Sequence, residues 1–157
     1  MKGTSEARAR VALKAAGLFV YKPPDDARNW KPCDFLTWQA PKQMDLRVDP
    51  ETGYGLADHA HTVSRWIEVK QIPSSALTMA ATGMRPSQRA GVAEAMRLRI
   101  PYWLLIFWKH PKIPAAARWT CLEMTRLSAI VPVSLPYRET AWVCMGTLDE
   151  CVEAMIE

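Results

Sequence analysis

Short apolar runs along the chain, separated by proline-rich and polar segments, predict an alternation of strands and helices. The most apolar run, IPYWLLIFW at residues 100–108, predicts a buried strand over residues 102–108. This run is far too short to span a bilayer, so no membrane span is expected. A second run, RWIEVKQI at residues 65–72, also predicts a strand, with two charged side chains set between its apolar positions.

Capping signals predict three helices. The first is expected over residues 4–16, with Thr4 or Ser5 as its cap and Gly17 as its stop. Its apolar face is expected to hold Ala7, Val11, Ala15 and Leu18. A basic helix is predicted over residues 85–99, which Pro86 can begin, and a final helix follows the capping box of Thr147 and Glu150.

The remaining apolar segments predict shorter strands at residues 18–22, 33–38 and 118–124, and near residues 141–146. Between residues 39 and 63 the chain is polar. There the segments 44–48 and 61–65 are expected to pair as a protruding hairpin around the turn DPETGYG. The order helix, strand, strand, strand, helix, strand predicts an α/β fold with a central mixed β-sheet flanked by helices. We expect a single domain over residues 1–157, with an insertion that can protrude at 39–63.

Composition is that of a globular protein: of 157 residues, 49% are hydrophobic and 23% are charged. The N-terminus is charged and leads into no long apolar run, so no signal peptide is expected. Cys33, Cys121, Cys144 and Cys151 contain no close CxxC pair, which argues against zinc and favours reduced thiols in the cytoplasm.

Charge is distributed unevenly along the chain. Residues 1–112 hold 17 lysines and arginines against 10 acidic residues, whereas residues 113–157 hold 3 against 6. A basic first part is compatible with a polyanionic partner, although many basic proteins bind no nucleic acid.

Glu68 and Lys70 are two residues apart on the predicted strand 65–72, so their side chains project from the same face. One interpretation is a solvated surface ion pair, which contributes little to stability. The other is a metal-dependent site for phosphodiester hydrolysis, in which carboxylates hold Mg²⁺ and a lysine stabilises developing charge. Such a site needs a second carboxylate, and Asp34 in KPCDFLTW can supply it.

Asp34 followed by Glu68-Val69-Lys70 resembles the core motif of the PD-(D/E)xK nucleases, in which an acidic residue on one strand precedes ExK on the next. The stretch FVYKPPDDARNWKPCDFLTW and the later RPSQ, helix and apolar strand are similar to segments of RecU-like Holliday-junction resolvases. The resemblance covers residues 1–110. It implies a restriction-endonuclease-like core and a homodimer that cuts a four-way DNA junction with Mg²⁺, for which Mn²⁺ can substitute.

The resemblance also implies roles for individual residues. Asp34 and Glu68 would bind metal together with the Val69 carbonyl, and Lys70 would position water or stabilise the transition state. Glu6 and Gln88 are further candidates for the catalytic site. Contacts to DNA phosphates are expected from five basic residues, Arg85, Arg89, Arg97, Lys14 and Arg10.

Several alternatives stay open. The distance in sequence from Asp34 to Glu68 is long, and Asp58 competes for the upstream acidic role; Asp34 is preferred because its context is strand-like. His59 and His61 could bind a metal, but a pair of this kind is more often part of a loop. Most of the seven tryptophans are expected in the core, with Trp30 and Trp38 near enough to the motif to contact bases. A different endonuclease on the same core, or a DNA-binding module without activity, would also fit this sequence.

Overall fold

The computed structural model describes residues 3–24, 31–39, 46–48, 51, 55–57, 63–80, 83–126, 134–138 and 142–157. Three α-helices lie in these residues: α1 (Gly3–Ala15), α2 (Pro86–Leu98) and α3 (Leu148–Ile156). The strands are β1 (Leu18–Tyr21), β2 (Phe35–Gln39), β3 (Leu46–Val48), β4 (Gly55–Ala57), β5 (Val63–Ile72), β6 (Thr78–Met79), β7 (Tyr102–Trp108), β8 (Trp119–Glu123), β9 (Leu135–Pro136) and β10 (Cys144–Gly146). Two 3-10 turns, η2 (Ala115–Ala117) and η3 (Met124–Arg126), flank β8.

A six-stranded sheet with the order β1-β2-β5-β7-β8-β10 forms the centre of the structure. Its central pair, β5 and β7, is parallel, with Glu68 opposite Leu104, and the other neighbouring strands are antiparallel. The chain passes from β5 to β7 through α2, because parallel strands need a crossover connection, which is usually a helix. The predicted α/β fold with a central mixed sheet is therefore confirmed.

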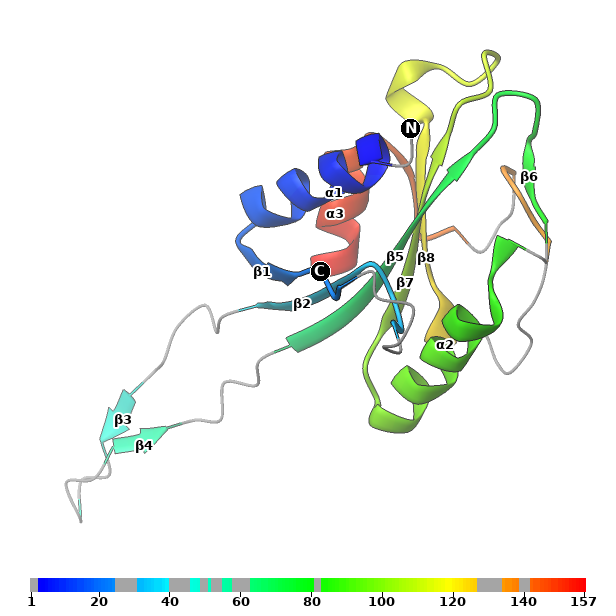
Figure 1. Cartoon of the computed structure of the whole chain (residues 1–157). Helices are drawn as coiled ribbons and strands as arrows, with labels where there is room; N and C mark the ends of the chain where they lie inside the picture. The colour runs from blue at the N-terminus through cyan, green and yellow to red at the C-terminus, as the bar shows by residue number, and fades with distance from the viewer. Residues whose placement is uncertain are drawn as a thin grey trace.

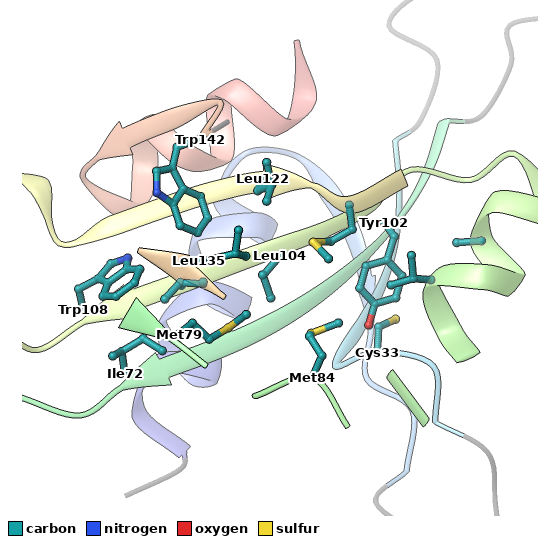
Figure 2. Close-up of a cluster of buried hydrophobic side chains, with 14 of the residues drawn as sticks. Cys33, Ile72, Met79, Met84, Tyr102, Leu104, Trp108, Leu122, Leu135 and Trp142 are labelled. Atoms are coloured by element: carbon teal, nitrogen blue, oxygen red, sulfur yellow. The ribbon is translucent and has the colours of Figure 1, made fainter. Parts of the chain in front are cut away.

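Helices cover both faces of this sheet, with α1 and α3 on one side and α2 on the other (Figure 1). Residues of β7 alternate between two hydrophobic clusters, because successive side chains of a strand point to opposite faces. Leu104 and Trp108 belong to the cluster on the α2 side, shown in Figure 2, whereas Trp103 and Leu105 pack under α1 and α3. A strand buried on both faces explains the unbroken apolar run at residues 100–108.

Helix α1 differs from the sequence-based expectation in its buried face. It begins at Gly3, so Ser5 lies inside the helix and does not cap it; the Ser5 hydroxyl instead donates a hydrogen bond to Gln71 Oε1 at 2.6 Å. The buried residues are Ser5, Ala9, Ala12 and Leu13, while Val11 is 69% exposed. The prediction was wrong because alanines lie on several faces of this helix and give a weak apolar pattern.

Strand β3 pairs with β4 in a separate two-stranded sheet, which lies apart from the central sheet in Figure 1. The expected pairing of segments 44–48 and 61–65 is therefore wrong. Residues 63–65 continue β5 and pair with the end of β2, with Val63 opposite Gln39. Asp58, His59, His61 and Trp30 lie outside the described residues.

The other two helices begin where the capping signals predicted. Arg85 precedes α2, with Pro86 as its first residue. Thr147 caps α3: its side chain accepts a hydrogen bond from the Glu150 N–H, and the Glu150 carboxylate accepts one from the Thr147 N–H. Among the described residues, no helix has both the length and the apolar character needed to cross a membrane.

Helix α2 makes an unusually close contact with the segment that precedes β2. A Cβ atom placed on Gly91 would lie 2.3 Å from the Pro32 carbonyl oxygen, so only glycine fits at this helical position. The same carbonyl accepts a hydrogen bond from the Tyr102 hydroxyl at 2.8 Å. Pro32 is thereby held between α2 and the central strand β7.

Candidate active site

A cavity of about 620 Å³ opens where α1, β5 and the start of α2 meet the segment before β2. Its lining is mostly polar and charged. It includes Asp34, Glu68 and Lys70 of the predicted motif, the further candidates Glu6 and Gln88, and also Lys31 and Arg85. Residues far apart in the sequence are thus brought together at one place.

Strand β5 positions Glu68 and Lys70 on the face of the sheet that α2 covers. Glu68 is 3% exposed, and its Oε1 lies 3.2 Å from the Lys70 Nζ. The Lys70 side chain is 18% exposed. Because the carboxylate is almost completely buried, the interpretation of a solvated surface pair is wrong. The attraction between Glu68 and Lys70 must instead offset the cost of removing their charges from water.

Asp34 lies one residue before β2, at the point where the pairing of β2 with β5 ends at Phe35 and Ile67. There the Asp34 Oδ2 accepts a hydrogen bond of 2.9 Å from the Val69 N–H. Asp34 is 6% exposed, and its carboxylate therefore accepts the hydrogen bond that a backbone carbonyl of β2 would accept from Val69 if the strand pairing continued. This bond fixes Asp34 beside Glu68, although strand β2 itself begins later than predicted.

Gln88 connects α2 to the charged pair on β5. Its Oε1 accepts hydrogen bonds from the Lys70 Nζ at 2.8 Å and from the Arg85 N–H at 2.9 Å, and its Nε2 donates to Glu68 Oε1. One amide side chain thus contacts both Glu68 and Lys70, and it also accepts a hydrogen bond from the backbone N–H at the start of α2. These contacts bring Gln88 into the cavity beside Glu68 and Lys70.

Burial dominates the electrostatics of the cavity. Burial, followed by the nearby charge of Asp34, raises the pKa of Glu68 from its ordinary value of 4.5 to about 7, and the ammonium of Lys70 opposes the shift. Burial also raises the pKa of the Cys33 thiol and of the Tyr102 hydroxyl, with Glu68 as the next cause in both cases. The raised pKa favours the protonated thiol and hydroxyl at neutral pH.

Glu6 lines the cavity, but its carboxylate is engaged elsewhere. Its Oε2 lies 3.0 Å from the Lys22 Nζ, an ion pair between α1 and the residue after β1. Glu6 also lines a neighbouring cleft of about 520 Å³ together with Arg10, Lys14 and Lys22. Two of the basic residues expected to contact DNA therefore border a cleft that adjoins the site.

The basic residues of α2 lie in different settings. Arg85 lines the cavity. The Arg89 Nε donates to the Met84 carbonyl at 3.1 Å, and Arg97 forms an exposed ion pair with Glu94 nine residues beyond Gln88 on the helix. Trp38 is 38% exposed and stacks on Phe19, with ring centroids 5.9 Å apart.

The donor set fits a magnesium ion. Within the described ranges, no three His, Cys, Asp or Glu side chains are clustered closely enough to hold a metal. Of the three carboxylates that line the cavity, Glu6 is paired with Lys22, which leaves Asp34 and Glu68. Mg²⁺ is commonly bound in this way, through one or two carboxylates, with water and substrate phosphate in the remaining positions. Burial is the main cause of the raised Glu68 pKa and repulsion by Asp34 the second, and a divalent ion bound between the two carboxylates would relieve that repulsion.

Lys31 is a member of the site that the sequence did not reveal. Its Nζ lies 3.3 Å from the Asp34 Oδ1, and the Lys31 and Asp34 side chains are 24% and 9% exposed. Lys31 lies in a proline-flanked loop segment without periodicity, where nothing predicts the direction of a side chain. Its only signal was a separation of three residues from Asp34.

Comparison with known proteins supports the fold. No protein-family model matches the chain, and no curated protein sequence matches it. Among solved structures, the chain is similar to Hjc of Archaeoglobus fulgidus, a Holliday junction resolvase from an archaeal hyperthermophile, with a TM-score of 0.55 and 12% sequence identity. The match covers 97% of this chain and 98% of that one, so the chain shares the restriction-endonuclease-like fold of this resolvase over nearly its whole length.

Proposed function

We propose that the protein is a Mg²⁺-dependent DNA endonuclease of the PD-(D/E)xK type that cuts Holliday junctions as a homodimer, with RecU-like enzymes as its nearest functional type. The observation that carries this proposal is the cavity in which Asp34, Glu68 and Lys70 lie together with Gln88. The shared fold with an archaeal resolvase supports the choice of substrate.

Each residue has a chemical role in this proposal. Asp34 and Glu68 bind the ion, with the Val69 carbonyl as a third ligand. The ion, when bound, lowers the pKa of a water molecule and neutralises charge on the scissile phosphate. Lys70 stabilises the additional negative charge of the transition state, and Gln88 holds the Lys70 ammonium in place through the 2.8 Å contact. Arg85, Arg89, Arg97, Arg10 and Lys14 contact the DNA backbone.

The test is a cleavage assay on labelled four-way junction, linear duplex and single strand, with Mg²⁺, with Mn²⁺ and without divalent ions. We expect the junction to be cut in preference to the duplex. Glu68→Ala and Lys70→Ala should each lower the single-turnover rate by at least 100-fold, as expected for loss of a metal ligand or of a charge-stabilising group. Glu153→Ala on α3 and Lys112→Ala after β7 are matched controls, since both residues are exposed and outside the cavity.

Each contrary result has a defined meaning. Near wild-type cleavage by a folded Glu68→Ala or Lys70→Ala variant would remove the site assignment. Equal cutting of duplex and junction would indicate a general endonuclease on this core, and DNA binding without any cleavage would indicate a binding module. A strict monomer in light scattering would contradict the dimer, because a twofold enzyme is what matches two symmetric strands.

A further inference from the structure

Two lysines, not one, lie beside the carboxylates of the cavity. Lys70 contacts Glu68 at 3.2 Å, as the ExK pattern predicts, and Lys31 contacts Asp34 at 3.3 Å. Each carboxylate thus has its own ammonium partner in the protein.

The position of Lys31 bears on the role proposed for Asp34. One Asp34 oxygen, Oδ2, accepts a hydrogen bond from the Val69 N–H, and the other, Oδ1, faces the Lys31 Nζ. Each oxygen keeps a second lone pair, but a cation that approaches Oδ1 meets the positive charge of the Lys31 ammonium there. A lysine side chain has a flexible four-carbon stem, so it can withdraw without moving the backbone.

We propose that Lys31 is a counter-ion that divalent metal displaces from Asp34, and that its ammonium then contacts the incoming DNA phosphate. In the absence of metal, Lys31 neutralises Asp34 and limits its repulsion of Glu68. When the ion binds, its positive charge repels the Lys31 ammonium. The ammonium then moves toward the open side of the cavity, where the DNA phosphate approaches. This inference rests on the proposed function, since it assumes that the cavity binds metal.

If metal displaces Lys31, the substitution Lys31→Gln should change the affinities for Mg²⁺ and for DNA in opposite directions. Lys31→Gln removes the competitor at Asp34 and should tighten Mg²⁺ binding in the absence of DNA by about tenfold, the equivalent of one pK unit for a close charge pair. The same substitution should weaken DNA binding. It should also make the negative slope of log K against log salt shallower by about 0.9, the contribution of one phosphate contact. A merely structural lysine would not give this combination.

Calorimetry of MgCl₂ binding to the DNA-free protein is the first experiment. It is run at pH 8.5, where Glu68 is ionised, so that protonation of Glu68 does not compete with the metal. Lys31→Arg keeps the charge and should retain the wild-type affinity for Mg²⁺. Lys112→Gln, an exposed lysine outside the cavity, is the matched control for loss of one charge. Circular dichroism verifies the fold of each variant.

DNA binding is measured by anisotropy with a labelled four-way junction in Mg²⁺ over a range of salt concentrations. All proteins in this experiment carry Lys70→Ala, so that DNA is not cut, and the variants with and without Lys31→Gln are compared. A smaller salt slope for the variant with Lys31→Gln supports the phosphate contact, whereas an unchanged slope overturns it.

The results separate this inference from the proposed function. If the wild-type protein binds Mg²⁺ and Lys31→Gln binds it with equal or lower affinity, the displacement is wrong while the metal site stands. If only Lys31→Gln binds Mg²⁺, Lys31 is a strong competitor and the inference holds. If neither protein binds Mg²⁺, both the inference and the proposed metal site are overturned.

Discussion

Glu68 should destabilise the metal-free protein at neutral and alkaline pH. Its pKa is raised from 4.5 to about 7, chiefly by burial, so the folded protein prefers the protonated carboxyl. The stability that protonated Glu68 provides is fully present below pH 4.5. It is lost as the pH rises from 4.5 through 7, and the loss is complete above that range.

The size of the effect follows from the two pKa values. Their difference corresponds to about 3 kcal/mol of unfolding free energy, at about 1.4 kcal/mol per tenfold change in the equilibrium constant. Glu68→Gln removes the charge and keeps the shape and one acceptor oxygen, but Lys70 loses its ionic partner. We therefore expect Glu68→Gln to be more stable than the wild type by about 1–3 kcal/mol at pH 8, and equal to it at pH 4.5.

Urea unfolding in the presence of EDTA at several pH values between 4.5 and 8.5 measures this difference. Glu153→Gln is the matched control, because that carboxylate is exposed on α3. Added Mg²⁺ should then stabilise the wild type and not Glu68→Gln, since ligand binding to the folded state raises its stability. A constant difference between wild type and Glu68→Gln over the whole pH range would refute the assignment of this pH dependence to Glu68.

Two further substitutions test single contacts by urea unfolding. Asp34→Ala leaves the buried Val69 N–H without an acceptor, so it should be less stable than Asp34→Asn by about 1–2 kcal/mol; equal stability of the two variants would show that this bond contributes nothing. Thr147→Ala removes the cap of α3 and should cost about 1 kcal/mol, whereas Thr147→Ser should stay close to the wild type. A Thr147→Ala variant as stable as the wild type would contradict the role of the cap.

Elements with a strong local signal were predictable from the sequence. The unbroken apolar run of β7, the proline at the start of α2 and the capping box of α3 each depend on neighbouring residues only. The common face of Glu68 and Lys70 follows in the same way from the period of a strand. These features were sufficient to predict the order of the core elements and the fold class.

Contacts between distant segments were not predictable. Val11 was expected on the buried face of α1 but is exposed, because the choice of face depends on the sheet and not on the helix alone. Strand β3 was paired with the wrong segment, since short strands of similar composition give no register signal. Lys31 was missed for a related reason, because a loop residue acquires its direction only from the partner that it meets.

The close contact of Gly91 with Pro32 determines when during biosynthesis the cavity can be complete. Both carboxylates, Asp34 and Glu68, precede α2 in the chain, whereas the surfaces that clamp Pro32 come from Gly91 on α2 and Tyr102 on β7. A nascent chain that has emerged only as far as Arg85 therefore holds both proposed metal ligands and the Val69 N–H that Asp34 accepts from, but neither of the surfaces that hold Pro32 in place. We expect such a chain to lack nuclease activity, so that the capacity to cut DNA arises only when the central parallel strands and their crossover helix have come together.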